Sequence, residues 1–192
     1  MRRAVFAAPH AKIHQADFFE WARTTSERFE CAAGNPPFIR YQTFAGQERE
    51  RALSYCASLG AKFSGLTSSW APFLVAAASL LKSGGRLSFI VPAEIGHAPY
   101  STPLLEYLVA NFSTVHIVAV RTKLFPELSE DCWLLYAAGK GGRTQHIRFS
   151  ALDVLRPIDH PPRKFYNVSV EEWRGTWKKR LRPFLLDDEA RP

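Results

Sequence analysis

The sequence predicts an α/β fold built around a mostly parallel β-sheet. Apolar residues recur at helical spacing over residues 70–81 and again over residues 103–112. Between these two helices, residues 87–91 form a short apolar run stopped by a proline, as expected of a buried strand. Because Gly84 and Gly85 separate the first helix from this strand, the segment follows the order of helix, glycine stop and strand that is typical of parallel sheets.

An earlier strand leads into the most distinctive stretch of the chain. Residues 29–33 predict a short strand, and the segment Gly34-Asn35-Pro36-Pro37-Phe38 follows it directly. The polar groups of this loop then lie at the carboxyl end of a strand, where open α/β sheets bind ligands. Residues 11–16 predict another short strand, which would place Asp17 at a strand end in the same way. Asp17 is equally suited to be the N-cap of a helix that begins at Phe18.

The residues of the Asn35 loop favour a specific kind of binding. Pro36 and Pro37 have fixed φ angles and no backbone N–H, so the loop is stiff and its carbonyl groups require donors from elsewhere. The Asn35 side chain adds a further carbonyl oxygen, and Phe38 offers a flat apolar face. A rigid pair of acceptors beside an aromatic ring fits a planar ring that carries an exocyclic amino group. The alternative is an ordinary Asn-Pro turn with a buried phenylalanine.

The second half of the chain predicts a hairpin and a basic helix. Residues 115–120 and 132–138 are strand-like and are joined by a loop that contains Phe125. Further on, five apolar residues recur at helical spacing among basic ones, and the apolar set is Trp173, Trp177, Leu181, Phe184 and Leu185. The basic residues Lys178, Lys179 and Arg180 of this helix can lie along DNA phosphates. The helix can equally be a packed one with a solvated basic face.

Composition limits the class of protein and of partner. The chain has 192 residues, 46% of them hydrophobic, which is enough to bury a core. Its net charge of +7 and its pI near 9.5 favour a polyanionic partner. Its three cysteines form no C-x-x-C pair, which favours a reducing, cytoplasmic setting. No apolar run is long enough to span a membrane, and the six scattered histidines predict no metal site.

The tetrapeptide Asn35-Pro36-Pro37-Phe38 resembles motif IV, [DNS]-P-P-[YFW], of the S-adenosylmethionine-dependent amino-methyltransferases. Its Asn-Pro-Pro form is typical of the adenine-N6 DNA methyltransferases of restriction-modification or phage-defence systems. The resemblance implies that Asp17 and Phe18 act as motif III, which binds the adenine of the cofactor. It also implies that Phe125 acts as motif VIII and stacks, together with Phe38, on an adenine flipped out of double-stranded DNA.

The resemblance further implies a partial Rossmann-like methyltransferase sheet with a C-terminal antiparallel hairpin and a C-terminal basic helix. Residues 1–150 would form the catalytic domain, and residues 151–192 would lead toward a recognition domain. Arg40 lies close enough to the loop to contact a DNA phosphate, although an exposed charge with no such role is the simpler interpretation. The F-x-G-x-G turn that holds the methionine end of the cofactor is not found before Asp17, so we expect a chain truncated relative to the family.

Two alternatives stay open. The same tetrapeptide is similar to that of protein-glutamine and ribosomal-RNA amino-methyltransferases, so the acceptor can differ. The chain can also be a non-catalytic fragment or a split subunit, for which a separate polypeptide supplies the missing cofactor motif or the recognition domain. The sequence indicates neither the DNA target site nor the oligomeric state.

Overall fold

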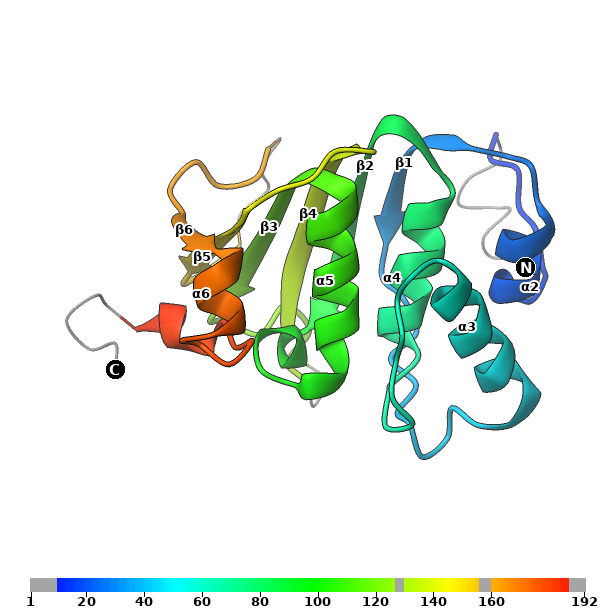
Figure 1. The fold of residues 1–192 in the computed structure, drawn as a ribbon, viewed down its shortest axis with the longest axis horizontal. Helices are drawn as coiled ribbons and strands as arrows, with labels where there is room; N and C mark the ends of the chain where they lie inside the picture. The colour runs from blue at the N-terminus through cyan, green and yellow to red at the C-terminus, as the bar shows by residue number, and fades with distance from the viewer. Residues whose placement is uncertain (1–9, 127–129, 156–159, 187–192) are drawn as a thin grey trace.

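The computed structural model describes residues 10–126, 130–155 and 160–186. These residues form one six-stranded sheet with the strand order β1-β2-β4-β3-β5-β6 (Figure 1). The strands are β1 (Phe29–Gly34), β2 (Leu81–Pro92), β3 (Phe112–Val120), β4 (Cys132–Lys140), β5 (His146–Leu152) and β6 (Tyr166–Ser169). The α-helices are α2 (Phe18–Thr24), α3 (Gly46–Ser58), α4 (Trp70–Ser79), α5 (Thr102–Asn111) and α6 (Val170–Arg174). Three short 3-10 helices are η1 (Ala93–Gly96), η2 (Pro99–Ser101) and η3 (Arg182–Leu185).

The sheet is mixed, so the expectation of a mostly parallel sheet was wrong. The pairs β1–β2 and β3–β5 are parallel, whereas β2–β4, β3–β4 and β5–β6 are antiparallel. The antiparallel hairpin of β3 and β4 is confirmed, but β5 and β6 extend the sheet beyond it. Because β4 inserts between β2 and β3, the strand order is not that of a simple Rossmann sheet. A crossover helix predicts that two strands run parallel, but not that a third strand separates them.

The core lies between one face of the sheet and helices α4 and α5, which lie on the same side of the sheet (Figure 1). Alternate residues of the strands point to this layer, as the pleat requires, and among them are Leu87, Phe89, Val91, Val115, Ile117, Trp133, Leu135, Ile147 and Phe149. Helices α2 and α3 pack against α4 through a smaller cluster around Ala22 and Ala76. Because β1 runs parallel to β2, and β2 and β3 are both antiparallel to β4, the carboxyl ends of β1, β2 and β3 lie at one edge of the sheet.

Two boundary predictions were wrong. The predicted helix over residues 70–81 ends earlier, at Ser79, and the glycine pair lies within β2 instead of stopping the helix. Gly84 has a φ of 75° and lies where the pairing of β1 with β2 is irregular, so it serves a bend in the strand. Residues 11–16 form no strand, because they lead directly into α2.

The predicted C-terminal basic helix was also wrong. Helix α6 is short, and the chain then turns through Lys178 and Lys179, whose φ angles of 46° and 62° are incompatible with an α-helix. The apolar residues of this segment are buried in the main core, including Trp173 and Leu181. The tail therefore packs as a folded segment of the same layer. The division of the chain at residue 150 stays a prediction, although β5 crosses that position.

Within the described ranges, none of the helices is long and apolar enough to cross a lipid bilayer.

Candidate active site

The Asn35 loop leaves the carboxyl end of β1 and is fixed to the start of α4 by one serine. The buried Ser69 hydroxyl donates to the Pro37 carbonyl oxygen at 2.6 Å and accepts from the Ile39 amide nitrogen at 3.0 Å. The Ser69 amide nitrogen in turn donates to the Ile39 carbonyl oxygen at 2.9 Å. Three hydrogen bonds to one residue hold the second half of the loop, and the two prolines stiffen the first half.

The two acceptors that the sequence indicated are available in this loop. Asn35 is exposed, and no hydrogen bond within the described residues uses its side chain or the Pro36 carbonyl oxygen. Pro36 is buried, and Phe38 is half-buried against the core, so the loop is anchored on both sides of these acceptors. A donor with two hydrogens that approaches this edge of the sheet meets two oxygens that are available to accept hydrogen bonds.

An apolar hollow runs along β1 beside these acceptors and is called the β1 hollow below. Its volume is about 450 Å³, and its lining includes Phe18, Trp21, Gly34, Asn35, Phe73 and Phe89. The structure therefore brings together Phe18 and Asn35, which the sequence indicated separately. None of the described residues that line the hollow is charged. Its aromatic walls fit a planar ring, and the described lining includes no glycine-rich turn for an amino-acid moiety.

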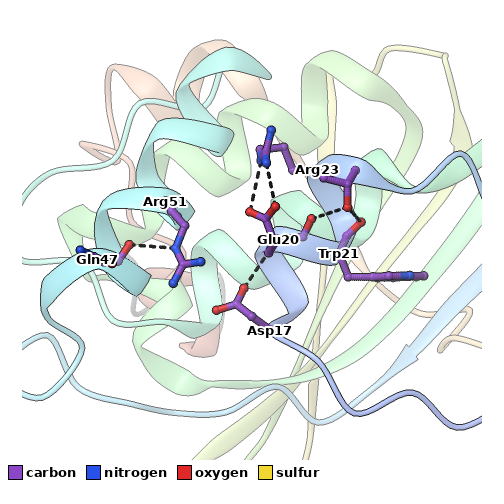
Figure 2. A network of polar contacts seen from close by, with 7 residues as sticks. Asp17, Glu20, Trp21, Arg23, Gln47 and Arg51 are labelled. Atoms are coloured by element: carbon purple, nitrogen blue, oxygen red, sulfur yellow. Dashed lines mark hydrogen bonds and ion pairs between the residues drawn. The ribbon is translucent and has the colours of Figure 1, made fainter.

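Asp17 and Phe18 have defined local roles at the start of α2. Asp17 Oδ1 accepts from the Glu20 amide nitrogen at 2.8 Å and is the N-cap of the helix, which is the alternative that the sequence left open (Figure 2). The Phe18 ring stacks on Phe73 of α4, with the centroids 4.1 Å apart and 24° between the planes. Asp17 does not line the β1 hollow, and a contact of either residue with a cofactor stays a prediction.

An ion pair joins the Asn35 loop to the connection between β3 and β4. The Arg40 Nη2 and Nε atoms lie 2.9 Å and 3.2 Å from Glu130 Oε1, and this hydrogen bond raises the pKa of the Arg40 guanidinium. Phe125 lies on the same connection and is half-buried. Within the part of the chain that the structure describes, Phe38 and Phe125 make no ring contact with each other. Their stacking on the two faces of a base stays a prediction.

Sequence reasoning missed a hydrogen-bonded chain at the end of β2. The Trp70 Nε1 atom donates to the Tyr100 hydroxyl at 3.0 Å, and that hydroxyl donates to the Glu94 carboxylate. Burial and the Glu94 carboxylate raise the pKa of Tyr100, so this hydroxyl stays protonated. The charge of Glu94 also makes a small contribution to the raised pKa of Arg40, after the larger one from Glu130. The available signal was a carboxylate directly after a buried strand.

The predicted DNA-contacting lysines and arginine of the tail lie in different surroundings. The Lys179 Nζ atom is 3.4 Å from Glu106, which also binds Arg174, so an acidic residue of α5 neutralises this part of the tail. Lys178 is exposed. Arg180 lines a second, larger hollow at the carboxyl edge of the sheet. Contacts of these residues with DNA stay predictions.

No cluster of three or more potential metal ligands occurs among the described residues. The one fully enclosed histidine serves the fold: the His116 Nε2 atom lies 2.9 Å from the Ser150 hydroxyl, which itself donates to the Lys164 carbonyl oxygen. Burial, with the nearby Arg148, lowers the pKa of His116 to about 4, so this ring is neutral at pH 7.

The mixed sheet with helices packed on it is an α/β fold that solved structures of restriction-modification proteins share. The methyltransferase subunit of a type I restriction-modification system from Streptococcus thermophilus matches with a TM-score of 0.64 and 16% identity, over 88% of this chain and 40% of that one. The type IIG restriction endonuclease BpuSI matches with a TM-score of 0.57 and 17% identity, over 81% of this chain and 21% of that one. The DrdV–DNA complex matches with a TM-score of 0.51 and 14% identity, over 64% and 14%.

These identities show the fold alone, but the sequence also matches a family. The profile of the Eco57I restriction-modification methylase family matches residues 6–125, which is more than half of the chain and includes the Asn35 loop. The chain therefore belongs to the Eco57I restriction-modification methylase family. It spans between 14% and 40% of the length of the three structures just described.

Proposed function

We propose that this chain holds the methyl-accepting part of a DNA adenine-N6 methyltransferase site, with S-adenosylmethionine as the methyl donor. One observation carries the proposal. Neither the Asn35 side chain nor the Pro36 carbonyl group has a hydrogen-bond partner among the described residues, and both lie on a loop that Ser69 clamps at the carboxyl end of β1. The chain's membership of a restriction-modification methylase family supports DNA as the acceptor.

The chemistry of the methyl acceptor, an adenine amino group, explains why two hydrogen-bonding oxygens are needed. The lone pair of the adenine amino nitrogen is delocalised into the ring, which makes the nitrogen a poor nucleophile. Hydrogen bonds from its two hydrogens to the Asn35 side chain and the Pro36 carbonyl oxygen favour a pyramidal nitrogen and orient its lone pair. Transfer would form an N–CH₃ bond as the S–CH₃ bond of a bound donor broke, and an amino proton would leave to solvent. S-adenosylmethionine, when bound, supplies the electrophilic methyl group.

Other residues hold the two planar rings that such a reaction brings together. The aromatic wall made by Phe18 and Phe73 is suited to the adenine ring of the donor in the β1 hollow. Phe38 beside the loop, with Phe125 on the β3–β4 connection, is suited to stack on the target adenine. Such stacking offsets part of the few kcal/mol that base extrusion costs.

The proposal is tested by Asn35→Ala, with Gln42→Ala as the matched control. Both side chains are exposed carboxamides of the same connection, so neither change should alter the thermal midpoint of unfolding. Removing one preorganised acceptor should lower methyl transfer to duplex DNA by about a hundredfold or more, whereas Gln42→Ala keeps the wild-type rate. Mapping of the methylated base should return N6-methyladenine. Transfer that survives in Asn35→Ala would contradict the assignment, and transfer to a glutamine peptide or ribosomal RNA instead of DNA would change the acceptor.

A second candidate function is a subunit that is active only with a partner polypeptide. Among the described strands, β1 pairs on one side only, with β2, and its Phe29 and Cys31 side chains are exposed. An open edge of this kind can receive another strand. Transfer by the chain alone would exclude this candidate, whereas transfer that requires an added second polypeptide would select it.

A further inference from the structure

A second hollow, called the basic hollow below, opens at the same edge of the sheet as the Asn35 loop. Its volume is about 760 Å³, and the residues that matter for its chemistry are His97, Arg121, Asp131, Trp133, Arg180 and Arg182. Ala93 follows the end of β2, Val120 is the last residue of β3, and both line the hollow. Because β1 runs parallel to β2, the Asn35 loop leaves the sheet at this edge too.

The charges around the basic hollow are unbalanced. Among the described residues, three arginines line it against one carboxylate, Asp131. Within the described residues, the side chains of Arg180 and Arg182 have neither an ion pair nor a hydrogen bond, and both are exposed. Arg121 donates to the Leu185 carbonyl oxygen at 3.0 Å and lies 3.4 Å from Asp153. Planar guanidinium groups with donors to spare suit phosphate oxygens, which they can bind in pairs.

The hollow is also rigid, which suits a binding site better than a solvated surface. The Trp133 ring packs so closely on Gly96 that a Cβ atom added there would lie 2.5 Å from it. The Leu181 amide nitrogen donates to the Gly96 carbonyl oxygen at 2.7 Å, so the arginine-bearing tail is tied to the end of β2. Leu181 is fully buried between Arg180 and Arg182. The two arginines are therefore presented from a fixed backbone.

A polar atom in the wall also lacks a partner. The Nδ1 atom of His97 is buried and has no hydrogen bond within the described part of the chain. Burial and the neighbouring Arg182 lower the pKa of His97, so the ring tends to be neutral beside the arginines. The ligand-facing donors of the hollow are therefore the guanidinium groups of Arg180 and Arg182, which have no partner among the described residues and which a ligand rich in oxygen atoms would satisfy.

We propose that the basic hollow binds a backbone phosphate of the DNA strand that carries the target adenine, through Arg180 and Arg182. This inference rests on the proposed function, because it takes DNA as the partner. The phosphate contact and the acceptor pair then lie at one edge of one sheet, linked through the adjacent residues Glu130 and Asp131. A strand held by its phosphate at one hollow presents its extruded base to the Asn35 loop.

The test compares two double variants of the full chain that remove the same charge. Arg180→Gln/Arg182→Gln removes two arginines of the basic hollow, and Arg86→Gln/Arg143→Gln removes two exposed arginines from near the opposite edge of the sheet. Affinity for a fluorescent duplex is measured over a series of salt concentrations. The slope of log K against log salt should fall by about 0.9 for each phosphate contact that is lost, so by about 0.9 in the first variant, which loses the one proposed contact. The control pair should keep the wild-type slope.

A third variant separates charge from shape. Arg180→Lys/Arg182→Lys keeps both charges and should keep the slope, although it loses the paired hydrogen bonds and therefore some affinity. If wild type and Arg180→Gln/Arg182→Gln have equal slopes while the chain transfers methyl groups to DNA, phosphate binding by the basic hollow is refuted and the proposed function is not. If the chain binds inorganic pyrophosphate through the two arginines, and the salt dependence of DNA affinity does not change, the hollow binds a free ligand and DNA-phosphate binding is refuted too. A changed slope without methyl transfer would overturn the proposed function alone.

Discussion

The two hollows share the sheet as a scaffold and differ in chemistry: the β1 hollow runs along β1 as far as Asn35, and the basic hollow lies at the carboxyl ends of β2 and β3. Counting the described residues alone, the β1 hollow is about 450 Å³ with uncharged aromatic walls, whereas the basic hollow is about 760 Å³ and has three arginines. Residues of the sheet itself contribute apolar side chains to both, such as Phe89 to the first and Trp133 to the second. The difference comes from the segments that follow or precede the strands, which is where function varies on a common fold.

The difference also separates what each hollow is suited to bind. A planar ring loses little by entering an uncharged aromatic slot, whereas a phosphate needs donors that replace its water. Under the proposed function, the adenine ring of the methyl donor would enter the β1 hollow, and a phosphate of the DNA strand would enter the basic hollow.

Gly96→Ala should have the largest effect and should act on the basic hollow. The added Cβ atom would lie 2.5 Å from the Trp133 ring, which is buried against Phe149 and has little room to move. Overpacking of this kind should lower the free energy of unfolding by about 3 kcal/mol, measured by urea denaturation. At a temperature where the variant is folded, its affinity for duplex DNA should fall while its affinity for S-adenosylmethionine is unchanged.

Gly65→Ala is the matched control for this prediction. A Cβ atom at this position would meet only one atom, the Arg49 Nη2 at 3.7 Å, which is an ordinary contact. The control should therefore keep wild-type stability and wild-type DNA affinity. A Gly96→Ala variant as stable as Gly65→Ala would mean that Trp133 yields easily, and the rigidity of the basic hollow would then be refuted.

Ser69→Ala should have the next largest effect and should act on the Asn35 side. The change removes the donor to the Pro37 carbonyl oxygen and the acceptor of the Ile39 amide, which lowers the free energy of unfolding by about 2 kcal/mol. A looser loop misplaces the acceptor pair, so methyl transfer should fall by about tenfold to a hundredfold at saturating substrates. The slope of DNA affinity against salt should not change.

Ser79→Ala provides the comparison within the same helix. The Ser79 hydroxyl lies 2.9 Å from the Tyr55 hydroxyl and donates to the Ala76 carbonyl oxygen at 2.7 Å, at the end of α4 that lies away from the loop. This variant should lose stability without a loss of methyl transfer per folded molecule. Equal transfer by the two variants would show that the clamp on the loop does not matter for catalysis.

Sequence patterns predicted the β1 side of the edge much better than the basic side. The strand before Asn35, the loop and the hairpin of β3 and β4 follow from runs of apolar residues and from the geometry of proline, which are local signals. Helix α3 was missed because it buries only Ala52 and Cys56, which leaves almost no apolar periodicity to read. Strand β5 was missed because a buried strand of seven residues with two basic members gives a weak signal.

The tail shows why the basic hollow could not be predicted from the chain alone. Its apolar residues do have helical spacing, but Lys178 and Lys179 take left-handed backbone angles that only the packed core imposes. The partner that neutralises Lys179 and Arg174 is Glu106, which is distant in sequence. Arg180 was identified as a basic residue of the tail, but its neighbours in the hollow come from three other segments of the chain. For Asp17, the sequence offered two roles, and the structure shows the capping one.

Arg40→Gln should have the smallest effect, and it tests whether the two sides of the edge are coupled. The Arg40 side chain is 66% exposed, and its ion pair with Glu130 is accessible to salt, so the pair should add little to stability. The variant should slow methyl transfer by no more than about fivefold, and the exchanged pair Arg40→Glu/Glu130→Arg should recover part of that loss. Single-turnover rates and the salt dependence of DNA affinity measure both effects. A fall of about 0.9 in the slope for Arg40→Gln would show instead that Arg40 leaves Glu130 and contacts a phosphate itself. In that outcome the phosphate sites extend across the edge to the Asn35 loop, and the separation of the two hollows by chemistry would no longer hold.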